Sequence, residues 1–192
     1  YNANIKAENC QITNTLGDCM AIYGGKASVL YCTLAQFYPF DAQRGVALRF
    51  ANRYGEADYP LHLMECRNSL VTGYASDEMM GETGDTLVAF NYRFYDCILR
   101  TPPIGDSLLL EKFVNVVFEV PEDTVQGTDH FVNIDTDNLY YDFHLDSLST
   151  ARGRAKAIDA CPLDRDGRER GQAPDVGCYQ YFGREGATSG RR

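Results

Sequence analysis

The sequence has no tryptophan, and it has no stretch of about 20 uninterrupted apolar residues, the length that a membrane-spanning helix needs. We therefore expect no transmembrane span. The sequence also lacks a CxxC pair and any cluster of cysteine and histidine at zinc spacing. No segment keeps helical periodicity over three turns, so we expect almost no helix. Any aromatic surface must be built from the 13 Tyr and 10 Phe.

The sequence also has fewer basic than acidic residues. Eighteen Lys and Arg stand against 27 Asp and Glu, which gives a net charge of −9. A nonspecific nucleic-acid binder needs a basic face, so this balance argues against a nucleic-acid partner. The length of 192 residues is that of about one domain, and 44% hydrophobic and 23% charged residues are typical of a folded chain.

Seven cysteines leave at least one thiol unpaired. Four of them recur within or at the start of short strand-like runs, at spacings of 22, 34 and 31 residues: Cys10, Cys32, Cys66 and Cys97. Free cysteine behaves as a small buried hydrophobe, and no activating base stands beside any of these four. We therefore predict that they stack in the interior as a ladder of core residues.

Short runs of alternating apolar and polar residues, rich in Val, Phe, Tyr, Leu and Thr, follow one another between turn residues. They include 27–34, 60–66 and 91–99, and the runs 131–134 and 140–145 continue the series. Units of roughly 20 to 35 residues predict an all-β solenoid, in which each coil stacks on the next. An antiparallel sandwich or jelly roll is the alternative, but it gives no reason for the recurring cysteine context.

The carboxyl-terminal segment is the most specific part of the sequence. It reads AIDACPLDRDGR over 157–168 and APDVGCYQY over 173–181, and FHLDSLSTA precedes both at 143–151. These segments resemble the ending of secreted right-handed parallel β-helix proteins of Bacteroidetes, the choice-of-anchor Q group. The resemblance implies β-helix coils over residues 1–150, a cap over 151–182 and a flexible tail over 183–192. It also implies further coils before Tyr1.

The same resemblance implies an extracellular protein on the outer-membrane surface, attached through a lipid anchor outside this chain. The sequence departs from the family at Cys161, where Gly is usual, at Cys178, where Ala is usual, and at Thr150, where Pro is usual. Both cysteines stand in segments that are expected to pack together, so the resemblance implies a disulfide between them. Such a bridge fits an oxidising location.

The resemblance leaves activity open, because this fold hosts lyases, hydrolases and non-catalytic proteins alike. We expect a non-catalytic module that binds a polysaccharide or docks on an outer-membrane transporter complex. A polysaccharide lyase or glycoside hydrolase acting on acidic polysaccharide, and a purely structural surface protein, are the alternatives. Rings expected to be exposed for stacking on sugars are Phe37, Tyr38, Phe40 and Tyr59.

A lyase on this fold would use an Asp-bound calcium ion and an Arg base. The candidates are Asp41, Arg44 and Arg49, with Arg67 and Arg93 on the same flank. Surface ion pairs are the alternative role for all of these side chains.

A second calcium hypothesis concerns Asp164 and Asp166, which alternate before Gly167 as carboxylates do at the start of many calcium loops. The alternative is a structural turn, in which these carboxylates accept backbone N–H groups and face Arg168.

Overall fold

The computed structural model of the chain describes residues 1–120 and 126–183. Within these residues the helices are α1 (Ser107–Leu110) and the 3₁₀ helix η1 (Gly127–His130), each of four residues. Nearly all other regular structure is strand, so the prediction of an all-β protein with almost no helix is confirmed. The predicted flexible tail, apart from Gly183, lies outside the described residues.

Three parallel sheets make up most of the molecule. The first sheet consists, in spatial order, of β1 (Asn4–Glu8), β4 (Gly25–Leu30), β9 (Leu61–Arg67), β12 (Phe90–Tyr95) and β14 (Phe113–Val114). The second consists of β2 (Gln11–Thr13), β5 (Thr33–Gln36), β10 (Leu70–Gly73), β13 (Ile98–Arg100) and β15 (Val117–Glu119). The third consists of β3 (Met20–Tyr23), β6 (Leu48–Ala51) and β11 (Met79–Glu82).

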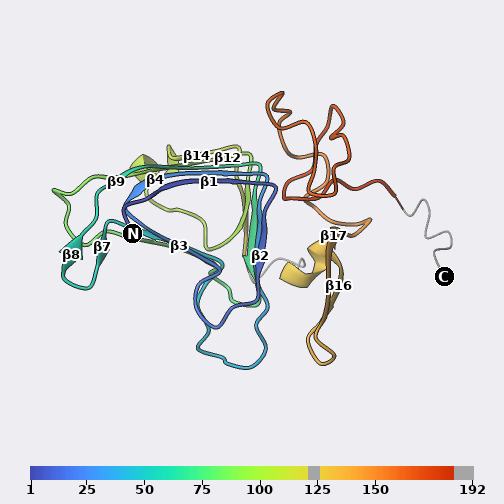
Figure 1. Cartoon of the computed structure of the whole chain (residues 1–192), viewed down its shortest axis with the longest axis horizontal. Coiled ribbons are helices and arrows are strands. Elements are labelled where there is room, and N and C mark those ends of the chain that lie inside the picture. Colours follow the sequence, from blue (N-terminus) through green and yellow to red (C-terminus); the bar gives the residue numbers. More distant parts are fainter. Residues whose placement is uncertain (121–125, 184–192) are drawn as a thin grey trace.

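The chain visits the three sheets in a fixed order. β1, β2 and β3 lie in the first, second and third sheet, and β4, β5 and β6 return to the same sheets beside them. β9, β10 and β11 repeat this round, whereas the last two rounds, β12–β13 and β14–β15, contribute only to the first and second sheets. Figure 1 shows the sheets as sides around a common interior.

The corner between the first and second sheets has the same backbone conformation on every round. It contains one residue with φ between 49° and 54°, namely Asn9, Tyr31, Asn68, Asp96 and Asn115 in turn. Asn and Asp occupy this left-handed region more readily than other residues with a Cβ atom, so four of the five corners suit it. The backbone N–H at each of the first four corners donates to the carbonyl that precedes the next corner, for example Asn68 to Tyr95 at 3.0 Å.

The inward side chains of the three sheets form one apolar cluster. The predicted run 27–34 is divided by the corner, so Val29 points inward from β4 and Leu34 from β5. The largest fully buried members of the cluster are Ile22, Leu34, Leu48, Phe50, Leu61, Met64, Phe94 and Leu99. Burial of such side chains contributes about 1.5–3 kcal/mol each, so this cluster is the main source of stability.

Two hairpins depart from the parallel pattern. β7 (Arg53–Tyr54) and β8 (Ala57–Asp58) pair antiparallel, and so do β16 (Phe131–Asp135) and β17 (Tyr140–Leu145). The prediction that 131–134 and 140–145 continue the series of stacked strands is therefore wrong. Only four residues separate β16 from β17, which is enough for a hairpin but too short for a passage through the other sheets.

The second sheet is covered on both faces. Every residue of β5, β10 and β13 is buried. The β16–β17 hairpin and the segment 151–183 lie against its outer face in Figure 1. A second apolar cluster joins them to it through Phe37, Leu70, Ile98, Phe131, Phe143, Leu145, Val176 and Cys178. The first and third sheets keep outer faces where binding groups can be exposed.

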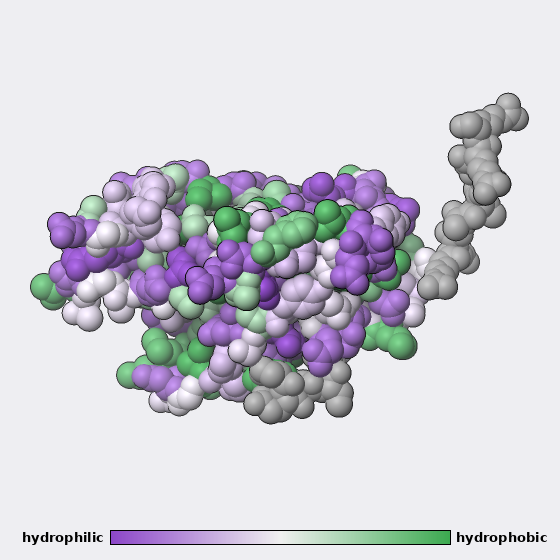
Figure 2. All heavy atoms as spheres, turned by 90° about the horizontal axis from the view of Figure 1, so that it is seen from below, coloured by the Kyte–Doolittle hydropathy of each residue, from purple (hydrophilic) through white to green (hydrophobic). Residues whose placement is uncertain are grey.

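Figure 2 views the molecule from below relative to Figure 1. Hydrophilic residues cover most of this face, and the hydrophobic residues on it are scattered among them.

Candidate functional site

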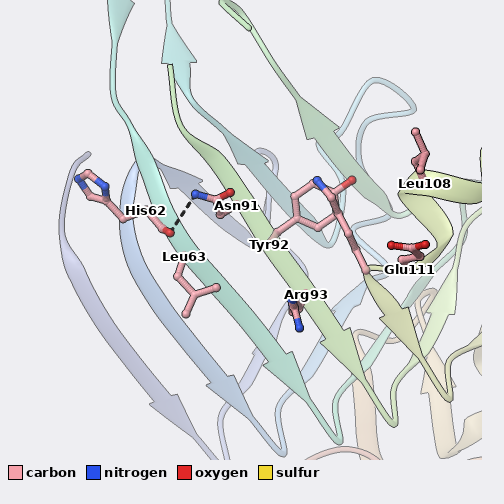
Figure 3. Close-up of a pocket in the computed structure, with 8 residues that line it drawn as sticks. His62, Leu63, Asn91, Tyr92, Arg93, Leu108 and Glu111 are labelled. Carbon is pink, nitrogen blue, oxygen red and sulfur yellow. Dashed lines mark hydrogen bonds between the residues drawn. The ribbon is translucent and has the colours of Figure 1, made fainter. Parts of the chain in front are cut away.

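A groove with a volume of about 460 Å³ lies on the outer face of the first sheet. Figure 3 shows side chains from β9, β12 and the α1 region facing it. Its lining residues are His62, Leu63, Asn91, Tyr92, Arg93, Leu108, Glu111 and Lys112. The lining combines cations, an imidazole, an amide and a carboxylate with apolar surface, which suits a polar ligand with many hydroxyl groups.

Strand geometry positions the groove floor. Successive side chains of a strand point to opposite faces, so Asn91 and Arg93 are exposed on β12 while Phe94 is buried. Asn91 Nδ2 donates to the carbonyl oxygen of His62 at 3.3 Å, as Figure 3 shows, and this bond ties β12 to β9. The floor is therefore fixed by the sheet itself.

The helix α1 forms one side of the groove. Its N-cap is Asp106, whose side chain accepts the N–H groups of Leu108 at 2.8 Å and Leu109 at 3.4 Å. This cap stabilises the turn that carries Leu108 and is followed by Glu111, and both of these residues line the groove. The sequence prediction contained no helix here, because four residues are too few for helical periodicity to show.

Cations and aromatic rings lie together at the groove and beside it. Lys112 Nζ lies 4.3 Å from the ring centre of Tyr92, and burial raises the pKa of that tyrosine. On the flank, Arg67 stacks at 3.9 Å on the ring of Tyr95, whose hydroxyl accepts from Arg93 Nη1 at 3.3 Å. Cation–π contact holds these side chains against the sheet without neutralising them.

The same outer face is richer in cations than the chain as a whole. Its exposed or half-buried cations are Lys6, Lys26, Arg67, Arg93 and Lys112, and its carboxylates are Glu8, Glu65, Glu111 and, at the corner near Arg67, Asp96. Lys6 pairs with Glu8 at 2.8 Å and Arg67 pairs with Glu65 at 2.7 Å. A face with more cations than carboxylates on a chain of net charge −9 is a local attraction for anions.

The predicted lyase residues do not converge. Asp41 lies in the exposed loop after β5 and accepts the N–H of Gln43 at 2.7 Å. Arg44 folds back toward the Asp41 carbonyl at 3.4 Å and lies over the Tyr74 ring at 5.5 Å. Both side chains therefore take part in local loop contacts.

Arg49 lies elsewhere, on the outer face of the third sheet. It bonds Asp18 at 2.7 Å and Glu82 at 2.8 Å, and these bonds raise the pKa of its guanidinium. Arg67 and Arg93 lie on the first sheet, not on the flank of Arg49. The structure thus distributes the predicted arginines over two sheets, and Arg49 has the ion-pair role that was the alternative.

The predicted sugar-stacking rings have different environments. Phe37 is fully buried between the second sheet and the β16–β17 hairpin, so the prediction that it is exposed is wrong. Phe40 is 69% exposed, and half-buried Tyr38 contacts its ring at 5.4 Å. The half-buried Tyr59 belongs to a tyrosine cluster that sequence analysis missed, made of Tyr1, Tyr23, Tyr54 and Tyr59.

Asp164 is a buried turn residue. Its Oδ1 accepts the N–H groups of Asp166 and Arg168, each at 2.9 Å, and its Oδ2 accepts that of Gln180 at 3.0 Å. Asp166 instead bonds His144 Nε2 at 2.9 Å. Asp164 therefore has the role that the structural-turn alternative expects, whereas the bond partner of Asp166 is an imidazole and not a backbone N–H group. In residues 1–120 and 126–183, no three His, Cys, Asp or Glu side chains are grouped to hold a metal ion.

Cys161 and Cys178 are both buried free thiols, so the predicted bridge between them is absent from this structure. Cys161 packs with Leu30 and Tyr31 and accepts from Asn9 Nδ2 at 3.4 Å. Cys178 belongs to the separate cluster that covers the second sheet. The two segments do pack on the same body, but each thiol faces a different part of it.

The four cysteines of the predicted ladder all reach the interior. Cys32, Cys66 and Cys97 are buried in the central cluster, and Cys10 packs against it. Their positions are not all equivalent, however. Cys10, Cys32 and Cys97 each follow a left-handed corner residue, whereas the residue that follows the corner Asn68 is Ser69. Cys66 lies within β9 and pairs with Val29 and Phe94.

Comparison with known proteins identifies no relative of this chain. No model of a protein family, no curated protein sequence and no solved structure matches this chain. In the part of the chain that the structure describes, none of the helices has the length and apolar composition needed to cross a membrane.

Proposed function

We propose that this protein is an exported, non-catalytic module that binds acidic polysaccharide along the outer face of the first sheet. The proposed architecture is a right-handed parallel β-helix with a carboxyl-terminal cap, held at the outer-membrane surface by a lipid anchor outside this chain. The fixed order in which the chain visits three parallel sheets supports this architecture. The role is that of an accessory subunit of a nutrient-uptake complex.

The observation that carries the proposal is the groove with Arg93 and Lys112 on its floor and wall. Arg93 lies on β12, and Lys112 directly precedes β14, the neighbouring strand. Neighbouring strands are about 4.8 Å apart, so a chain of sugars laid across them meets a new set of side chains at each strand. Two cations at this spacing fit carboxylates on successive sugars, and the groove's amide and imidazole fit hydroxyl groups.

A role in binding without turnover is supported by the contacts of the charged residues that were candidates for catalysis. Arg49 is already paired with two carboxylates, and Asp41 is bonded to its own loop. The groove itself contributes one carboxylate, Glu111, whereas glycoside hydrolysis generally uses two on opposite sides of the bond. The charged and polar groups of the groove therefore suit binding of a glycan better than its hydrolysis.

The proposal is tested by titrating the full chain with uronate oligosaccharides and with neutral oligosaccharides of equal length, with and without calcium. We expect uronate binding that weakens as salt is added, since the cations are exposed and screened. Arg93→Ala and Lys112→Ala each weaken binding about tenfold, the equivalent of about 1.4 kcal/mol. Lys156→Ala, an exposed lysine of the 151–183 segment, is the matched control and leaves binding unchanged.

Three outcomes overturn the proposal. Equal binding of neutral and acidic glycans removes the role of charge. Release of unsaturated uronates or reducing ends makes the protein an enzyme. Absence of binding to either class turns attention to a protein partner or to a purely structural role.

A further inference from the structure

Two of the buried thiols are in direct contact. Cys97 Sγ lies 3.9 Å from Cys66 Sγ and 3.5 Å from the Cys66 carbonyl oxygen. Cys66 is fully buried in β9, and Cys97 is 1% exposed at the corner after β12, the neighbouring strand. The pair therefore joins two successive rounds of the chain inside the central cluster.

Cys97 shares one kind of contact with other cysteines: its thiol donates to the carbonyl oxygen of Tyr95, two residues earlier, at 3.2 Å. Cys10 and Cys32 direct their thiols to backbone carbonyl oxygens, of Glu8 in the first case and of Ala7 and Leu30 in the second. Cys161 and Cys178 lie in two other clusters. Within residues 1–120 and 126–183, the feature that distinguishes Cys66 and Cys97 is the direct contact between their sulfur atoms.

We propose that Cys66 and Cys97 are joined by a disulfide when the chain folds in an oxidising compartment. This inference rests on the exported location proposed above, but not on glycan binding. Secreted proteins commonly retain disulfides, whereas thiols in the cytosol are kept reduced.

Only a short movement separates the free thiols from a bond. A disulfide has an S–S length of about 2.05 Å, so the two sulfur atoms must approach by about 2 Å. Cys97 stands directly after Asp96, the left-handed corner residue at φ 53°, where the chain leaves one sheet for another.

The reaction is a thiol–disulfide exchange with glutathione disulfide as the oxidant. The thiolate of one cysteine attacks the glutathione disulfide, forms a mixed disulfide and releases one glutathione thiolate. The second cysteine then attacks the protein sulfur, forms the Cys66–Cys97 bond and releases the second glutathione thiolate. The protein loses two electrons and two protons, and the oxidant becomes two reduced glutathione molecules.

Burial of Cys66 slows bond formation once the core has closed. The neighbouring Cys97 thiol and burial together raise the pKa of Cys66 well above its usual range, so the reactive thiolate is scarce in the folded protein. The same burial shields a completed bridge from reductants. We therefore expect a bridge that forms during folding and then resists reduction until the protein is denatured.

Peptide mapping gives a direct test, because trypsin separates the two cysteines. Cleavage after Arg53, Arg67, Arg93 and Arg100 places Cys66 in the peptide 54–67 and Cys97 in the peptide 94–100, each with a single cysteine. The full chain is denatured and reduced, refolded with reduced and oxidised glutathione, and then alkylated under denaturing conditions. Peptides are mapped without reductant.

We expect the peptides 54–67 and 94–100 to be linked and the other five cysteines to be alkylated. The linked pair is lost in Cys97→Ser and kept in Cys161→Ser, the matched control. In the refolded wild type, native-state reductant leaves the link intact, whereas reductant with denaturant breaks it. Alkylation of all seven cysteines in the refolded wild type, or a link between any other pair, overturns the proposal. No glycan enters this experiment, so its failure is distinct from failure of the proposed function.

Discussion

The guanidinium of Arg170 lies 3.9 Å from the ring centre of Tyr31, the residue at the second left-handed corner. Arg170 also donates to Asn9 Oδ1 at 3.0 Å and to the carbonyl oxygens of Gly177 and Cys178, each at 3.1 Å. One side chain of the carboxyl-terminal segment therefore contacts two successive corners of the sheets and its own segment. Burial lowers the pKa of this arginine, yet its bonds keep the charged form in place.

Replacing Arg170 should weaken the contact between the carboxyl-terminal segment and the corners of the sheets. We expect Arg170→Ala to lower the free energy of unfolding by about 2–4 kcal/mol, because several charge-assisted bonds and a stacking contact are lost together. Arg170→Lys should recover only part of the lost free energy of unfolding, since an ammonium group lacks the planar fork that reaches two carbonyls. Urea denaturation measures both. Arg154→Ala, an exposed arginine of the same segment, is the control and should stay within about 0.5 kcal/mol of wild type.

Asn68 should be the most costly of the corner asparagines to replace. It is fully buried, and its amide makes two bonds to the backbone of Lys156, donating at 2.8 Å and accepting at 3.0 Å. Asn68→Ala should therefore cost about 2–3 kcal/mol, the sum of a left-handed alanine and two lost bonds that are partly buried.

Asn115 provides a matched comparison for Asn68. It has nearly the same φ, 54° against 50°, but its amide donates to Asp96 Oδ1 in an exposed pair. Asn115→Ala should cost about 1 kcal/mol, from the backbone conformation. Equal losses in the two variants would contradict the role assigned to the Lys156 contacts.

These corners show what could be predicted from the sequence and what could not. Strand runs, the scarcity of helix and the inward cysteines follow from local alternation and composition. The alignment of one round with the next cannot be predicted in this way, because cysteine suits both an inward strand position and the position after a corner. Cys66 and Cys97 therefore occupy different positions in their rounds: Cys66 lies within a strand, and Cys97 follows a corner. The residue equivalent to Cys97 in the preceding round is Ser69.

Contacts between distant segments account for the other errors. Phe37 is in an aromatic turn sequence that looks exposed, but the rings of Phe131 and Phe143 lie 5.9 and 6.3 Å from it. The groove depends on α1, a single capped turn with no periodicity to read. Arg93 was singled out from the sequence, whereas Lys112 was missed because only the fold brings it beside Tyr92.

Glu78 should make stability fall as pH rises toward neutrality. It is fully buried, with one carboxylate oxygen accepting the N–H of Ala75 at 2.8 Å and the other that of Ala47 at 3.0 Å. Burial raises its pKa from 4.5 to about 7, although Arg44 and Arg100 oppose the shift. Between these two values the folded state holds a proton that the unfolded state has released, so the contribution of Glu78 to stability is fully present below pH 4.5 and is lost as the pH rises to about 7.

The loss attributable to Glu78 is about 3 kcal/mol across this range, as an order of magnitude. Urea denaturation at a series of pH values, for wild type and for Glu78→Gln, measures it. The variant should be less stable at low pH, because its NH₂ group cannot accept one of the two backbone bonds. Its stability should change less between pH 5 and pH 7. A wild-type slope identical to that of the variant would show that Glu78 is already ionised in the folded protein.

His144 should contribute in the same direction but over a different range. Burial disfavours its charged form, but Asp166 at 2.9 Å and Asp142 at 2.6 Å outweigh this and raise its pKa. Its stabilisation is therefore fully present below the unfolded pKa of about 6.5 and is lost as pH rises through the higher folded pKa. The pairs are partly exposed, so we expect His144→Gln to cost only about 0.5–1 kcal/mol at pH 5.5 and less at pH 9. His62→Gln, an exposed histidine of the first sheet, is the control. A cost for His144→Gln that grows with pH would contradict a protonated imidazole held between two carboxylates.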